Sequence, residues 1–125
     1  MTNPKYVRLF RTEFSFRHFI AKDRPELVDK ACLKPHNHLN AYLEVRVHTK
    51  DWVDFKDIKV AVLGSLDNLG EADDSKDKIR YIGGMDTETL VKELQKLIRI
   101  ELLQKHKDVK VGLRVWETGK YGIEL

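Results

Sequence analysis

Cysteine is almost absent from this sequence, which contains only Cys32. A single cysteine cannot form a disulfide within the chain, and such sparing use is typical of a reducing compartment. Long apolar runs are also absent, because nothing approaches the roughly 18 apolar residues of a membrane-spanning helix. Charged residues interrupt the first segment, where a signal peptide needs an apolar stretch. We therefore expect a cytoplasmic protein with no membrane partner.

An excess of charge of one sign is missing as well. Lys and Arg total 23 and Asp and Glu total 20, which gives a formal net charge of +3 from interspersed residues. The densest basic run, residues 105–110, contains an aspartate and no aromatic residue, unlike a nucleic-acid-binding surface. We therefore expect no nucleic-acid partner.

The 125 residues, of which 42% are hydrophobic, suit one packed domain spanning residues 1–125. Apolar periodicity predicts strands over residues 6–19, 38–47, 109–116 and 120–125. It also predicts two helices, one capped by Asp54 and ending near residues 65–68, the other capped by Asp86 and ending near residue 105. Residues 70–84 are predicted to be an exposed connection. The order ββααββ indicates an α+β fold with an antiparallel four-stranded sheet and two helices on one face.

A His-x-His pair is the most informative local motif. His36 and His38 lie two residues apart at the start of a predicted strand, so both imidazoles project from one face, as two ligands of one cation must. His18 ends the first predicted strand in phase with Phe14 and Phe16, and an antiparallel neighbour can bring it to the pair as a third ligand. The alternative for His18 is a core histidine bonded to a backbone carbonyl, and the residues alone favour that alternative.

Cys32 lies four residues before His36, so its sulfur can approach the same site. Three neutral histidines with an open fourth position are typical of a catalytic zinc ion. A thiol beside a divalent cation has a lowered pKa and becomes a usable base or nucleophile. The alternative is that Cys32 only packs in its loop.

These residues belong to a longer series of motifs, which runs Phe14-x-x-x-His18, Cys32-x-x-x-His36-x-His38, Asp54-Phe55, Leu66-Asp67 and Glu117-Thr118. With this series, the chain resembles the family of 6-pyruvoyltetrahydropterin and 6-carboxytetrahydropterin synthases over nearly its whole length. The resemblance implies the tunnelling fold (T-fold), which agrees with the predicted element order. The gap between Cys32 and His36 looks more like the carboxytetrahydropterin branch, which serves queuosine and archaeosine synthesis, than like the animal branch.

The resemblance also implies an activity, that of a zinc-dependent lyase acting on 7,8-dihydroneopterin triphosphate. Its product is 6-carboxytetrahydropterin or 6-pyruvoyltetrahydropterin, and its assembly is a homo-oligomer, a trimer or a hexamer of two stacked trimers. Cys32 matches the proton-abstracting base, and Glu117 matches the glutamate that accepts paired hydrogen bonds from the pterin ring. The residues that match the zinc ligands are His18, His36 and His38.

The chain departs from the family at Asn68, where a histidine usually acts with the cysteine and the aspartate matched by Asp67 as an acid–base group. A neutral amide cannot exchange a proton at pH 7, and losing such a group costs about 10²–10⁴ in rate. His48 and His106 lie at the ends of predicted elements and have no reason in the sequence to converge on the site. Two alternatives therefore stay open: a variant that cleaves the side chain to give a hydroxymethylpterin, and a non-catalytic zinc- and pterin-binding homologue.

The phase of the second strand departs from the family too. His36 and His38 share strand parity with the polar Glu44 and oppose the apolar Leu43. One extra residue near Leu39 would restore the phase, and such an extra residue defines a β-bulge. We therefore expect a bulge between the histidines and the apolar part of the strand.

Overall fold

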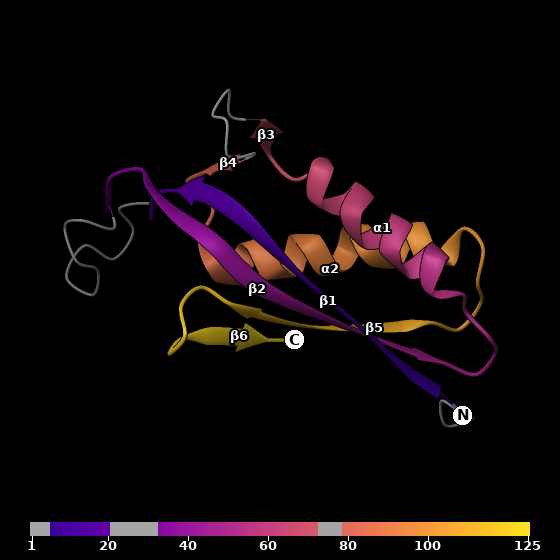
Figure 1. The fold of residues 1–125 in the computed structure, drawn as a ribbon. Coiled ribbons are helices and arrows are strands. Elements are labelled where there is room, and N and C mark those ends of the chain that lie inside the picture. Colours follow the sequence, from indigo (N-terminus) through magenta and orange to yellow (C-terminus); the bar gives the residue numbers. More distant parts are fainter. Residues whose placement is uncertain (1–5, 21–32, 73–78) are drawn as a thin grey trace.

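The computed structural model describes residues 6–20, 33–72 and 79–125 (Figure 1). The elements in chain order are β1 (Tyr6–His18), β2 (His36–Thr49), α1 (Phe55–Asp67), β3 (Glu71–Ala72), β4 (Arg80–Gly83), α2 (Thr87–Leu103), β5 (Lys110–Trp116) and β6 (Gly122–Glu124). They form two layers, a sheet and a pair of helices that lie together on one of its faces. The predicted α+β class and both predicted helices are confirmed. No helix in the described ranges is long and apolar enough to cross a membrane.

The sheet has the strand order β3-β4-β1-β2-β5-β6. The four predicted strands correspond to β1, β2, β5 and β6, which pair antiparallel as expected. The sheet has more strands than the four that were predicted, because β3 and β4 form within residues 70–84. β4 pairs parallel with the end of β1, so the sheet is mixed. These strands have two and four residues, which is too short for an alternating apolar pattern to show in the sequence.

The hydrophobic core lies between the helices and the sheet face that they cover. Alternate residues of the central strands point into it because successive side chains of a strand face opposite sides. The fully buried strand residues include Phe16, Leu43, Val45, Leu113 and Val115, and the helices supply Ile58, Val62, Leu90, Leu94 and Ile98. Burial on one sheet face therefore fixes which way every side chain of β1 and β2 points.

Both helices begin at the predicted aspartate caps. The Asp54 carboxylate accepts a hydrogen bond from the backbone N–H of Lys56 at 3.0 Å, and Asp86 accepts one from Thr89 at 2.7 Å. Each bond satisfies a donor that the first turn of a helix leaves unpaired.

The predicted β-bulge is present where β1 pairs with β2. Phe14 and Phe16 are two residues apart on β1, whereas their partners Ala41 and His38 are three residues apart on β2. The extra residue bends the backbone at Asn40, which has a φ of 54° and whose N–H donates to the Ser15 hydroxyl at 2.9 Å. The bulge therefore turns the histidines of β2 onto the sheet face that carries the core.

Candidate metal centre and the adjoining cavity

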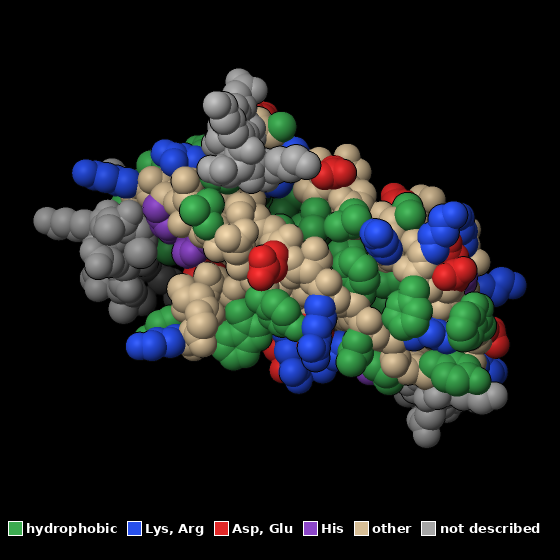
Figure 2. Space-filling model, in the orientation of Figure 1, with side chains coloured by type: hydrophobic (Ala, Val, Ile, Leu, Met, Phe, Trp, Pro, Cys, Tyr) green, Lys and Arg blue, Asp and Glu red, His purple; other side chains and the backbone are tan. Residues whose placement is uncertain are grey.

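Three histidines meet at the end of the sheet where β1 ends and β2 begins. His18 lies directly opposite His36 on the neighbouring strand. Two residues further along the same pair of strands, His38 lies opposite Phe16. One ligand nitrogen from each histidine lies within 4.8 Å of the others, and the Nε2 atoms of His18 and His38 are 3.1 Å apart. Figure 2 shows histidine side chains, in purple, reaching the surface at this end of the molecule. The sequence-based grouping of the three histidines is thus realised in space.

Backbone carbonyls orient two of the imidazoles from behind. Nδ1–H of His18 donates to the carbonyl of Met85 at 2.8 Å, and Nδ1–H of His36 donates to the carbonyl of Lys34 at 2.9 Å. Since a carbonyl can only accept, each bond selects the tautomer whose Nε2 carries a free lone pair. His18 is therefore both a buried histidine bonded to a backbone carbonyl and a candidate ligand, so the two interpretations are compatible.

The surroundings of His18 and His38 favour neutral imidazoles. Burial lowers the pKa of His18. Burial, followed by the nearby His18 and His36, lowers the pKa of His38 to about 4. Metal binding requires an unprotonated imidazole, so these two side chains are ready to coordinate near neutral pH.

The three nitrogens fit one divalent metal ion. Histidine nitrogens that lie about 2.0–2.1 Å from a tetrahedral ion are roughly 3.3 Å from one another. The His18–His38 separation of 3.1 Å is close to this value, and the ligand nitrogens of the group all lie within 4.8 Å of one another. An all-imidazole donor set suits zinc, copper, iron or nickel. The geometry thus identifies three histidines that could hold a metal ion, without identifying the metal.

Glu117 stands beside the group, directly after β5. Its carboxylate Oε2 lies 3.9 Å from Nε2 of His38, and burial raises the pKa of this carboxyl while His36 opposes the rise. The following turn is held by the N–H of Glu117, which donates to the carbonyl of Tyr121 at 3.0 Å, and by the Thr118 hydroxyl, which accepts two backbone N–H bonds. The half-buried carboxylate therefore has a fixed backbone and a position next to the histidines.

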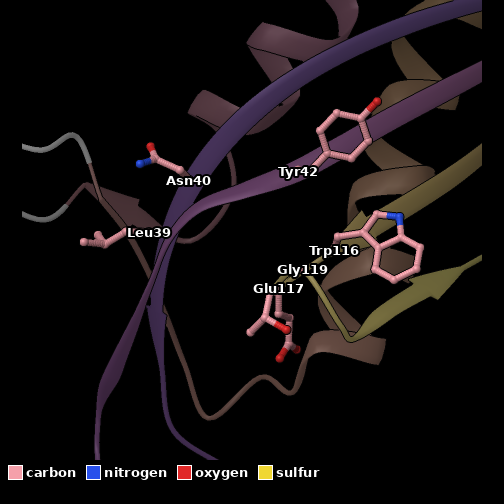
Figure 3. A pocket seen from close by; sticks show the side chains of 7 residues that line it. Leu39, Asn40, Tyr42, Trp116, Glu117 and Gly119 are labelled. Atoms are coloured by element: carbon pink, nitrogen blue, oxygen red, sulfur yellow. The ribbon is translucent and has the colours of Figure 1, made fainter.

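A cavity of about 480 Å³ adjoins Glu117 (Figure 3). Figure 3 shows Leu39 and Asn40 of the bulge on one side, with Tyr42 and Trp116 on the other. The remaining lining residues are Glu117, Thr118 and Gly119. Sequence reasoning singled out Glu117 but missed Tyr42 and Trp116. The available signal was an aromatic residue at an outward position of a strand, immediately before Glu117.

Two predicted site residues lie elsewhere in the fold. Asp67 is the last residue of α1 and Asn68 is its C-cap, and both are exposed. The N–H of Asn68 donates to the carbonyls of Gly64 and Ser65 at 3.1 and 3.2 Å. Within the described part of this chain, neither joins the group of candidate metal ligands. The predicted base, Cys32, lies outside the described residues.

The remaining histidines also stay apart from the group. His106 bonds to the Asp57 carboxylate at 2.9 Å, which joins the end of α2 to α1. His48 lies near the other end of β2, opposite Val7 and Lys110. Within the described residues, neither of these histidines belongs to the group of candidate metal ligands.

Several solved structures match the chain over almost its full length. The 6-pyruvoyl tetrahydropterin synthase of Caenorhabditis elegans matches with a TM-score of 0.73 and 15% identity, covering 100% of this chain and 98% of that one. The 6-pyruvoyl tetrahydropterin synthase of Plasmodium vivax gives 0.60 and 15%, with 97% and 98% covered. An uncharacterized protein from Wolinella succinogenes gives 0.61 and 12%, with 96% and 97% covered. No family model matches the sequence, and no curated protein matches it.

Proposed function

We propose that this chain, which has the fold of the 6-pyruvoyl tetrahydropterin synthases, is a zinc-dependent lyase acting on 7,8-dihydroneopterin triphosphate. Its product would be 6-carboxytetrahydropterin or 6-pyruvoyltetrahydropterin. The convergence of three histidines beside Glu117 and a cavity supports the proposal best. By the same likeness, we propose a cytoplasmic homo-oligomer, a trimer or a hexamer.

The proposed metal ligands are His18, His36 and His38. Bound zinc would lower the pKa of the substrate's side-chain hydroxyls and polarise the carbonyl that develops there. The chain's own contribution is to hold the imidazoles in the ligating tautomer through the carbonyls of Lys34 and Met85. Those two bonds supply the outer support that metal-binding histidines usually have.

Glu117 is the proposed anchor of the pterin ring. A carboxylate has two oxygens in one plane and can accept paired bonds from the ring's amino and amide N–H groups. Partial burial strengthens such bonds because less water competes for the donors. The 3.9 Å between Glu117 and His38 keeps the anchor next to the metal ligands.

Cys32 remains the proposed proton-abstracting base, with Asp67 and Asn68 as its proposed partners. Asn68 supports the competing proposal of a zinc- and pterin-binding homologue without turnover, because its amide cannot transfer a proton. Asn68 is exposed at the end of α1. The two proposals share the metal and the ring anchor and differ only in turnover.

The test is to purify the protein, measure bound zinc, and incubate it with 7,8-dihydroneopterin triphosphate while products are identified by mass spectrometry. We expect about one zinc per chain and a product whose mass identifies the carboxy or pyruvoyl derivative. His36→Ala should lose the zinc, whereas His48→Ala, a histidine outside the group, should retain it. Zinc that persists in His36→Ala would overturn the metal assignment. Zinc with no conversion would favour the non-catalytic homologue, and a hydroxymethylpterin would favour side-chain cleavage.

A further inference from the structure

We propose that Trp116, held in position by Gly122, is the stacking wall of the cavity and selects ligands with a flat two-ring heterocycle. The inference rests on the proposed function and adds a specificity-determining residue to it. Trp116 would contact the face of the ring, whereas Glu117 contacts its edge.

Gly122 fixes where the indole lies. Trp116 and Gly122 are directly opposite each other on β5 and β6. A Cβ atom added to Gly122 would lie 2.6 Å from Cδ2 and 2.7 Å from Cε3 of Trp116. The indole therefore packs against the bare backbone of Gly122, an arrangement known from aromatic–glycine pairs across strands. Any side chain at position 122 would have to displace the ring.

The rest of the indole remains available to a ligand. Trp116 is 40% exposed and, in the part of the chain that the structure describes, no other ring or cation packs on it. Trp52, the other tryptophan, differs in this respect, because the Arg8 guanidinium lies 3.9 Å from the centre of its ring. Trp116 also lines the cavity beside Glu117.

The neighbouring strand completes the wall. Tyr42 lies directly opposite Trp116 on β2, and both side chains line the cavity. The cavity volume of about 480 Å³ falls within the range of about 300–1,000 Å³ that is usual for small-molecule sites. Trp116 and the next residue, Glu117, both line this space (Figure 3), so a planar ring bound there would have an aromatic side chain and a carboxylate among its neighbours.

This combination defines a chemical class of ligand. Stacking requires a flat π-system, and a carboxylate at its edge requires neighbouring N–H donors, as in the amino–amide edge of a pterin. Guanine has the same edge, whereas adenine lacks the amide N–H. We therefore expect pterins to bind, guanosine to compete, and adenosine to compete far less.

The first experiment uses the two tryptophans as reporters. In zinc-loaded Trp52→Phe, Trp116 is the only tryptophan, and titration with 7,8-dihydroneopterin should quench its emission to saturation. In Trp116→Leu, the affinity for 7,8-dihydroneopterin, measured by calorimetry, should fall about 10- to 100-fold, as expected for loss of one base–aromatic stack. Zinc content should stay at the wild-type level in both variants.

The second experiment moves the indole without removing it. Gly122→Ala should weaken 7,8-dihydroneopterin binding while the zinc content stays unchanged, since the new Cβ displaces Trp116. Gly64→Ala is the matched control, because a Cβ at this helical glycine meets nothing within 4 Å. Far-UV circular dichroism checks that both variants fold. If Gly122→Ala fails to fold, Trp116→Leu still tests the inference.

The outcomes separate this inference from the proposed function. Unchanged ring affinity in Trp116→Leu, or competition by adenosine equal to that by guanosine, would overturn the inference even if the substrate is converted. Binding that depends on Trp116 without any conversion would support the inference and overturn the lyase activity. Failure of the wild-type protein both to bind the pterin and to convert the substrate would overturn both.

Discussion

The two helix caps offer a matched pair of perturbations, because only one of them adjoins the metal centre. Asp54 and Asp86 each accept one backbone N–H in the first turn of their helix. Replacing such a cap by alanine costs about 0.5–2 kcal/mol. In a domain of this size, about 1 kcal/mol corresponds to a change in Tm of roughly 4 °C. We expect both Asp54→Ala and Asp86→Ala to lower Tm by a few degrees, with the larger decrease in Asp86→Ala because its carboxylate also has a hydrogen bond with the side chain of Thr89.

Their effects on the metal should differ. Asp86 follows Met85, whose carbonyl accepts the hydrogen bond that orients His18. Loosening the start of α2 should disturb that bond. Loss of a hydrogen bond that supports a metal-binding histidine typically lowers metal affinity about 10–100-fold. Because the carbonyl itself remains, we expect a loss near the lower limit, about 10-fold, in Asp86→Ala and none in Asp54→Ala. A chelator competition titration measures the affinity.

The pH dependence gives a further check on the cap. The side-chain and backbone hydrogen bonds of Thr89 lower the pKa of Asp86 in the folded protein. A lowered carboxyl pKa adds stability above the unfolded pKa of about 3.9, and this contribution is lost as the pH falls through the folded value. The difference in Tm between wild type and Asp86→Ala should therefore be constant above about pH 5 and shrink below about pH 4.

Equal zinc loss in both cap variants, or none in Asp86→Ala, would refute the reasoning.

Three other substitutions test separate parts of the structure. Asn68→His should raise turnover by up to about 10², measured with 7,8-dihydroneopterin triphosphate, if this position carries the family's acid–base group; no change would show that it does not. Asn40→Val should destabilise the fold by about 1–2 kcal/mol in urea unfolding, because a β-branched residue resists the positive φ of the bulge, whereas Asn40→Gly should be tolerated. Phe16→Ala should cost about 3–5 kcal/mol, because Phe16 is completely buried beneath the histidines; a cost below about 1 kcal/mol would contradict this packing.

Much of the fold was predictable because its signals are local. The caps at Asp54 and Asp86, the apolar stripes of both helices and the alternation in β2 and β5 each lie within a few residues. The bulge was predictable because it reverses the phase between His38 and Leu43. β3 and β4 were not, because their place depends on pairing between segments distant in sequence.

The candidate site, like the fold, has features that local sequence signals predict and features that depend on contacts between distant segments. The motif that contains His36 and His38 is local, but His18 reaches them only through the pairing of β1 with β2. Glu117 reaches His38 because β5 lies next to β2. The support from Met85 comes from a backbone carbonyl, which every residue has, so no side-chain pattern could reveal it. The role of Gly122 depends on a cross-strand contact that its identity alone does not indicate.

The bulge at Asn40 divides β2 into two segments that can change independently. Deleting one residue there would rotate His36 and His38 to the opposite side of the sheet together, while Ala41 and the residues after it keep their places in the core. A single codon lost at this point would therefore remove two of the three candidate metal ligands at once without replacing either histidine. The fold can thus outlast the grouping of the three histidines after one genetic event, and a descendant without that grouping would still contain every histidine in its sequence.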